Sequence, residues 1–113
     1  MTRTDSDDSP RRYRIEVSDT AVLEADAIYL WIGQGDPERA DRWYRELQKV
    51  YEGLEIFPSR NIALSDQPHV HRTLHGQYRV VYLVIEPSDD ESEGTVRILR
   101  VVHGSRQLES YFS

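Results

Sequence analysis

The sequence has no cysteine and no long apolar run. Without cysteine the chain forms no disulfide, thiol nucleophile, iron–sulfur cluster or cysteine-based zinc site. No apolar segment approaches the roughly 20 residues of a membrane-spanning helix, and the polar residues 1–12 lack the apolar stretch of a signal peptide. We therefore expect a cytoplasmic protein without membrane contact. Its 113 residues, 38% of them hydrophobic, suit one compact domain.

Positive charge is scarce and unevenly distributed. The net charge of −6 argues against a protein that coats nucleic acid by bulk electrostatics. Residues 13–57 contain five basic and ten acidic residues, and residues 86–93 add five acids and no base. Residues 58–85 and 94–113 together contain six arginines against two acids, and all four histidines. Acidic and basic side chains thus belong to different halves of the chain.

The first half of the sequence predicts a strand followed by two helices. Residues 1–12 have no periodicity, so we expect a disordered arm, whereas residues 13–17 alternate like a strand with one buried face. Residues 18–20 are all N-cap types, and apolar residues follow at helical spacing until the glycines at 33 and 35. Asp36-Pro37-Glu38 starts a second apolar-striped helix, which Pro58 ends. Two helices so closely joined should form an antiparallel hairpin.

The second half predicts three strands. Residues 59–68 are expected to form a loop, and strand patterns follow over residues 70–74, 78–85 and 95–103. The short connections between these runs favour an antiparallel meander. The fold class is therefore α+β in the order β-α-α-β-β-β, with the helical hairpin on one face of the sheet. The domain spans residues 13–108, and residues 109–113 form a tail.

Helical stripes and strand alternation predict the buried residues. We expect Trp31, Trp43, Tyr44 and Tyr51 in the core because they fall on apolar helix stripes. Both faces of strand 78–85 are apolar, although one helical hairpin covers only one face of a sheet. On the last strand, strict alternation places Val96, Ile98 and Val102 on one face and Leu99 and Val101 on the other.

Several short motifs follow one another along the chain: Asp36-Pro37 with Ala40, the Arg72-Thr-Leu segment, Gln77-Tyr-Arg-Val-Val-Tyr82, and Arg97-Ile-Leu-Arg-Val-Val-His-Gly-Ser-Arg106. In this order they resemble the RelE/ParE superfamily of toxins of type II toxin–antitoxin systems, also called plasmid stabilisation proteins. The resemblance covers about residues 13–108. It implies a cognate antitoxin as partner and no cofactor. The assembly would be a homodimer of the toxin or a toxin–antitoxin heterotetramer.

The superfamily divides by target. RelE-like members cleave messenger RNA on the ribosome without a metal, and ParE-like members poison DNA gyrase. For the RNA-cleaving branch the resemblance implies that Arg79 and Arg106 hold the scissile phosphate, and His103 has the chemistry of a general acid or base. The supporting residues would be His71, Arg72 and Tyr111.

The set of RNA-cleaving residues is incomplete, which favours the ParE-like branch. The resemblance implies lysines on the strand before Arg79, but the only lysine of the chain is Lys49 on the second helix. A gyrase inhibitor is therefore the favoured function. A ribosome-dependent ribonuclease and a degenerate toxin that only binds its antitoxin remain alternatives, and whether the protein is an enzyme depends on this choice.

The histidines raise the question of a metal site. His69 and His71 have the spacing of a two-histidine metal arm, to which His75 or His103 would add a third ligand. The spacing alone is a weak signal, and the resemblance implies no metal, so we expect none.

An uncovered apolar sheet face predicts a protein partner. We expect an antitoxin segment to fold over Val81, Leu83 and Leu99, with its acidic residues meeting Arg79 and Arg106. The chain's own tail, residues 108–112, is the alternative cover.

Overall fold

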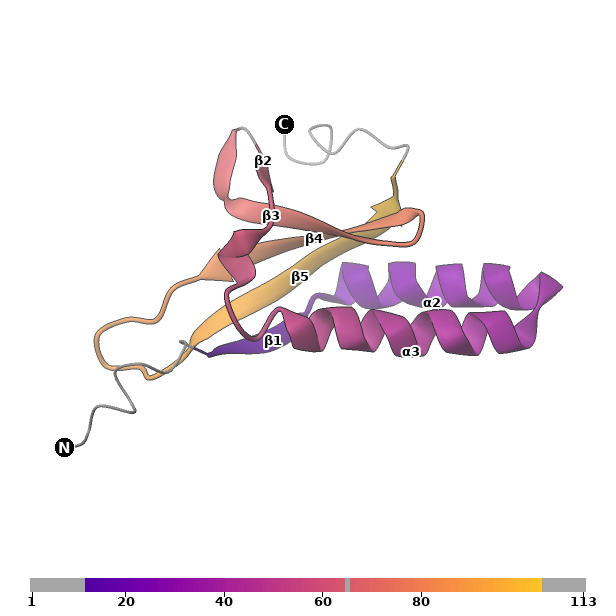
Figure 1. The fold of residues 1–113 in the computed structure, drawn as a ribbon, viewed down its shortest axis with the longest axis horizontal. Helices are drawn as coiled ribbons and strands as arrows, with labels where there is room; N and C mark the ends of the chain where they lie inside the picture. Colours follow the sequence, from indigo (N-terminus) through magenta and orange to yellow (C-terminus); the bar gives the residue numbers. More distant parts are fainter. Residues whose placement is uncertain (1–11, 65, 105–113) are drawn as a thin grey trace.

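The computed structural model describes residues 12–64 and 66–104. It confirms the α+β class: two helices lie side by side against one five-stranded sheet with strand order β1-β5-β4-β3-β2 (Figure 1). The elements are β1 (Tyr13–Val17), α2 (Asp19–Gly35), α3 (Pro37–Gly53), the 3-10 helix η1 (Pro58–Arg60), β2 (Ala63–Leu64), β3 (Gln67–His75), β4 (Tyr78–Ile85) and β5 (Gly94–His103).

Both helices begin at the predicted caps. The hydroxyl of Ser18 accepts a hydrogen bond from the backbone N–H of Ala21, and the carboxylate of Asp36 accepts one from Arg39, each at 3.1 Å. α2 ends at Gly35, the second of the two glycines expected to stop it, whereas α3 ends at Gly53, before the expected Pro58. Within the described ranges, neither helix is long and apolar enough to cross a membrane.

The sheet contains the predicted antiparallel meander and two further pairings. β3, β4 and β5 pair antiparallel, and β1 joins the edge of the sheet parallel to β5. The expected loop over residues 59–68 is wrong in part: it contains η1 and β2, and β3 begins at Gln67 rather than Val70. A two-residue strand is too short to show periodicity, and it is defined only by its pairing with β3.

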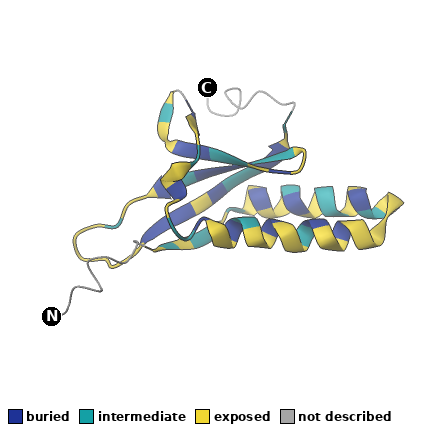
Figure 2. Ribbon diagram, in the orientation of Figure 1, coloured by how far each residue is buried: buried dark blue, intermediate teal, exposed yellow. Residues whose placement is uncertain are grey.

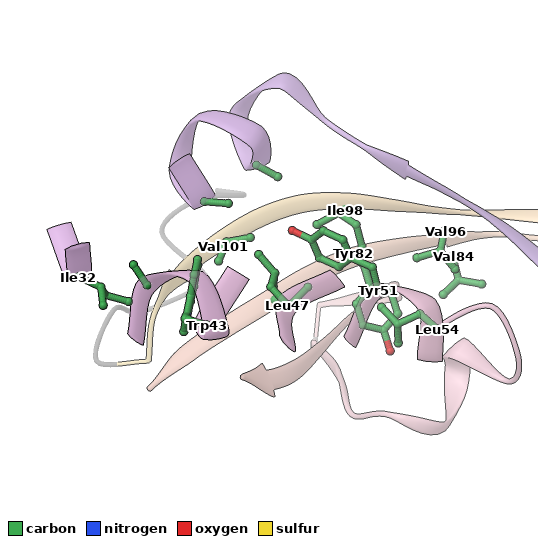
Figure 3. Packing of buried hydrophobic residues seen from close by; sticks show 14 residues of the cluster. Ile32, Trp43, Leu47, Tyr51, Leu54, Tyr82, Val84, Val96, Ile98 and Val101 are labelled. Atoms are coloured by element: carbon green, nitrogen blue, oxygen red, sulfur yellow. The ribbon is translucent and has the colours of Figure 1, made fainter. Parts of the chain in front are cut away.

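The main core lies between the helical hairpin and the sheet. In Figure 3, side chains of α3 point toward those of β4 and β5. The prediction is confirmed for Trp43 and Tyr51, which are buried, and Tyr44 packs against the cluster. It is wrong for Trp31, which is 69% exposed. The buried residues of this core include Leu47, Tyr51, Leu54, Val80, Tyr82, Val96, Ile98 and Val101.

A β-bulge on β5 reverses the predicted faces at the end of this strand. Val81 pairs with Arg100 but its neighbour Tyr82 pairs with Ile98, so Leu99 has no partner on β4. One extra residue shifts the alternation by one position. Val101 therefore joins the helix-side core, while Val102 lies in a second cluster on the far face, the opposite of the prediction from strict alternation.

Helix α2 is attached to the sheet at this bulge. The Glu24 carboxylate accepts hydrogen bonds from the backbone N–H of Val101 at 2.8 Å and from the Arg100 guanidinium at 2.6 and 2.9 Å. The Ser18 hydroxyl also donates to the carbonyl of Leu99 at 3.1 Å. Side chains of α2 thus satisfy backbone groups where the bulge interrupts the ladder.

The buried Tyr51 hydroxyl provides a test of the core. Among the described residues it has no hydrogen-bond partner, and burial raises the pKa of Tyr51 well above its usual value. We expect Tyr51→Phe to leave the free energy of unfolding unchanged or raise it by up to about 1 kcal/mol, because an unpaired buried polar group is removed. Urea unfolding measures the change.

Tyr82→Phe is the matched control. The Tyr82 hydroxyl donates to the carbonyl of Pro58 at 2.6 Å and accepts from the Asn61 amide at 2.9 Å, and burial raises the pKa of Tyr82, which keeps this donor protonated. Its removal should cost about 1–3 kcal/mol. A larger loss for Tyr51→Phe than for Tyr82→Phe would contradict this description of the core.

Candidate functional site

Arg79 lies on the face of the sheet that the helices do not cover. It pairs with Leu74 of β3 and with Val102 of β5. Because its neighbour Val80 points into the helix-side core, strand alternation turns Arg79 to the far face. Within the described part of the chain, the half-buried Arg79 side chain has no hydrogen-bonding or ionic partner.

Arg79 borders a hollow at the β3 edge of the sheet, with a volume of about 440 Å³. The described residues that line the hollow come from the segment after α3, from β3 and from β4, and they include no carboxylate. They are Arg60, Asn61, Ile62, Arg72, Thr73, Leu74 and Arg79.

Residues of the core fix the segment that forms one wall of this hollow. His71 Nδ1 lies 2.9 Å from the carbonyl oxygen of Asn61, to which it donates, and the buried His71 ring stacks on Tyr82 at 5.7 Å. The Asn61 amide donates to Tyr82 in turn. The Arg60 guanidinium donates to the carbonyls of Ile56 and Phe57 at 2.6 and 3.1 Å, near the carboxyl end of α3.

Arg72 and Arg79 give the hollow positive charge that no described residue pairs. Arg72 pairs with Val81 and Arg79 with Leu74, so the two arginines lie diagonally across neighbouring strands on one face, about 7–8 Å apart at Cα. As with Arg79, no described residue bonds to the Arg72 side chain. Two guanidinium groups without a carboxylate suit an anionic group, a phosphate or a carboxylate, which each can hold through two hydrogen bonds.

The other predicted nuclease residues do not gather at this hollow. His71 is buried under Asn61 and positions the wall rather than facing the opening. His103 ends β5, where its exposed ring contacts Tyr78, and it lines a different groove beside α2. The described lining of the hollow therefore contains no group that exchanges a proton near neutral pH.

The chain after β5 leaves the sheet next to Arg79. The backbone N–H of Gly104 donates to the carbonyl of Gln77 at 2.7 Å. A Cβ atom on Gly104 would lie 3.7 Å from Nε of Arg79. The predicted site residues Arg106 and Tyr111 lie outside the described residues.

The far face carries a small apolar cluster beside the hollow. Leu64, Val70, Val81 and Val102 are buried there. Leu83 and Leu99 are partly buried at its border, so they, and not Val81, expose apolar surface on this face. The far face thus has an apolar surface flanked by Arg72 and Arg79, which have no bonding partner among the described residues.

Five of the lining residues were absent from the predicted site: Arg60, Asn61, Ile62, Thr73 and Leu74. Strand alternation places Leu74 on the same face as Val70 and Arg72, so its position was predictable from the sequence. Arg60 and Ile62 lie in a segment without periodicity, and only the folded structure brings them against β3, where the Ile62 carbonyl accepts from the N–H of Arg72 at 3.0 Å.

A family model described as the ParE toxin of the type II toxin–antitoxin system, parDE, matches residues 15–108. The chain belongs to the ParE toxin family. The protein is therefore a toxin of a type II toxin–antitoxin system within the RelE/ParE superfamily, as the motifs predicted. Among curated proteins, none matches this ParE-family chain.

Solved structures show the same fold. A chain of the chromosomal ParDE system from P. aeruginosa superposes with a TM-score of 0.63 at 16% identity, over 81% of this toxin and 96% of that chain. A chain of the toxin–antitoxin complex RelBE2 from Mycobacterium tuberculosis superposes with a TM-score of 0.52 at 20% identity, over 85% of this toxin and 95% of that chain. The first structure is described as a ParDE toxin–antitoxin system and the second as a toxin–antitoxin complex.

Proposed function

We propose that this ParE-family toxin inhibits DNA gyrase and that its antitoxin neutralises it by covering the far face of the sheet. The observation that carries the proposal is a pair of arginines, Arg72 and Arg79, that bond to no described residue and lie beside a hollow whose described lining lacks an acid or base. Such a surface binds an anionic group on a macromolecule but does not supply proton transfer. Membership of the ParE family supports gyrase as the target.

The antitoxin fits the same face. Leu83 and Leu99 provide partly exposed apolar surface, and the arginines provide charge for acidic antitoxin residues. An extended or helical segment that folds on binding would bury this surface and remove the arginines from solvent at the same time. Neutralisation then follows from direct masking.

A ribosome-dependent ribonuclease is the second candidate. The feature of the hollow that favours a ribonuclease is the pair of neighbouring guanidinium groups, which suit a phosphate. His103 lines the groove beside α2, away from this hollow, so an RNA-cleaving site would need its proton-transfer group from outside the described residues.

Expression of the toxin without its antitoxin tests the choice. We expect growth arrest with DNA damage and loss of negative supercoiling in a reporter plasmid, while transcripts remain intact, and co-expression of the antitoxin should restore growth. Normal supercoiling together with codon-specific transcript cleavage would assign the protein to the ribonuclease branch. Unimpaired growth at confirmed expression would identify a degenerate toxin that only binds its antitoxin.

A further inference from the structure

Phe57, in the segment between α3 and β2, has an unusual backbone conformation. Its φ of 54° and ψ of 52° lie in the left-handed region, and no other non-glycine residue that the structure describes has a positive φ. A bulky side chain is rare in this region because its Cβ crowds a backbone carbonyl oxygen. Pro58 follows, and a residue before proline favours extended backbone. Glycine or asparagine would form the same turn with less strain.

Contacts on both sides hold the backbone of Phe57 in place. The two preceding residues pair with residues 12 and 13, where the chain enters β1. The Arg60 guanidinium donates to the Phe57 carbonyl at 3.1 Å. The next carbonyl, that of the buried Pro58, accepts a hydrogen bond from the Tyr82 hydroxyl at 2.6 Å. The strained conformation is thus fixed by its surroundings, which is the condition under which such strain persists.

The side chain of Phe57 contributes little to the core. It is 61% exposed, and it belongs to neither of the two hydrophobic clusters. The segment between α3 and β2 consists mainly of exposed residues around the buried Pro58 (Figure 2). Neither the turn nor the packing therefore explains a large apolar side chain at this position. Because strained residues held by their surroundings concentrate at functional sites, the exposed ring indicates a binding contact.

The surface next to Phe57 is both apolar and basic. Arg60, one 3-10 turn after Phe57, lines the hollow of the candidate site, and so do Ile62 and Leu74, whose side chains are 67% and 65% exposed. The two arginines of that site add positive charge, and the described lining contains no carboxylate. Aromatic residues and arginine are the most frequent anchors of protein–protein interfaces. The surface therefore suits an apolar pocket bordered by acidic side chains.

Other occupants fit this surface less well. The net charge of −6 repels nucleic acid and anionic lipid. A second copy in a two-fold contact would bring the arginines of both hollows together, without a carboxylate among the described lining residues to separate them. The proposed function gives the antitoxin its apolar contacts at Leu83 and Leu99. The target of the toxin is then the partner that the ring of Phe57 fits best.

We infer that Phe57 anchors the toxin to its target, with the ring in an apolar pocket of the target protein and acidic residues at the rim of that pocket against Arg72 and Arg79. The inference rests on the proposed function, in which the target is gyrase, and it adds the chemistry of the gyrase surface that binds the toxin. The fixed backbone holds the ring in one position before binding, which lowers the entropy cost of association.

Phe57→Asn tests the inference, because asparagine adopts the left-handed conformation readily but has no apolar ring. The concentration that half-inhibits supercoiling by purified gyrase should rise about ten- to a hundredfold, while the melting temperature should stay the same or rise by up to about 5 °C as strain is relieved. Phe57→Tyr keeps the ring and should retain most of the potency. Leu23→Gln removes a similarly exposed apolar side chain from α2; as the matched control, it should inhibit normally.

The same variants separate this inference from the proposed function. If the wild type inhibits gyrase and Phe57→Asn inhibits it equally, the inference is wrong and the proposed function stands. If the wild type does not inhibit gyrase, the proposed function fails, and growth inhibition at matched expression decides on Phe57: weaker inhibition by Phe57→Asn than by Phe57→Tyr supports the anchor, and equal inhibition overturns it.

Three further results would overturn the inference in favour of another role of Phe57. Loss of antitoxin binding in Phe57→Asn, with inhibition unchanged, would assign the ring to the antitoxin. Binding of the toxin alone to DNA or to anionic vesicles, abolished in Phe57→Asn, would assign the ring to nucleic acid or lipid. A lower melting temperature with unchanged potency would mean that the ring only stabilises the turn.

Discussion

Replacing Arg79 by alanine should lower the inhibitory potency of the toxin about ten- to a hundredfold while the fold is retained. Arg79 is half-buried, faces the hollow and has no partner among the described residues, so its charge is available to an anionic group of the target. A hydrogen bond to a charged group contributes about 1.5–3 kcal/mol, which corresponds to this loss. Growth inhibition at matched expression measures the effect, and a dose series of purified protein gives the potency.

Three further variants make the Arg79 result specific. Arg106→Ala should act in the same direction if the residue has the role that the resemblance implies. Arg79→Lys keeps the charge but loses the planar fork, so it should recover only part of the potency. Arg42→Ala on the exposed side of α3 should have no effect. Full toxicity of both Arg79→Ala and Arg106→Ala, with cooperative unfolding intact, would remove these arginines from the site.

Replacing Glu24 by alanine should destabilise the fold by about 2–4 kcal/mol. The change leaves the N–H of the buried Val101 without its acceptor and removes the carboxylate bound to Arg100, a pair in which both side chains are 22% exposed. For a domain of this size that loss lowers the melting temperature by about 10–25 °C. Thermal unfolding followed by circular dichroism measures it.

Glu24→Gln is the control for the charge. The amide oxygen of glutamine still accepts from Val101, so this variant should lose about 1 kcal/mol, much less than alanine. Equal losses for the two variants would mean that the ion pair, rather than the acceptor at the bulge, attaches α2 to the sheet. A loss below about 0.5 kcal/mol for Glu24→Ala would contradict the structural role altogether.

Local signals explain which elements were predictable from the sequence. The caps at Ser18 and Asp36 and the helical spacing behind them act within a few residues, and they gave both helices correctly. The alternation of β4 and the turn at Gly76, whose φ of 61° suits glycine, gave the β3–β4 hairpin.

Features that depend on contacts distant in sequence were not predictable. The bulge at Leu99 is defined by pairing with β4 and by Glu24 of α2, so strict alternation misplaced Val101 and Val102. Trp31 lies on an apolar stripe, but the stripe alone does not tell whether the covering layer belongs to the same chain.

The candidate site was predictable only in part. The resemblance identified both arginines: Arg79 by its place in the Gln77–Tyr82 motif, and Arg72 by its place on the strand before that motif. The hollow itself was not predictable, because residues 60–62 lie against β3 only in the folded chain. The ring of His71 bonds to the carbonyl of Asn61, and the Asn61 amide donates to the Tyr82 hydroxyl. Two of the four histidines considered as metal ligands have other contacts: the ring of His71 bonds to the carbonyl of Asn61 and that of His75 to the carbonyl of Trp43.

The most direct test of a gyrase-directed toxin is a supercoiling assay with purified gyrase, relaxed plasmid and purified toxin. We expect the wild-type toxin to block the introduction of supercoils and an equimolar amount of antitoxin to restore it, and we expect Arg79→Ala to require a concentration about ten- to a hundredfold higher. Full supercoiling in the presence of excess wild-type toxin, with cleavage of messenger RNA on added ribosomes, would contradict it.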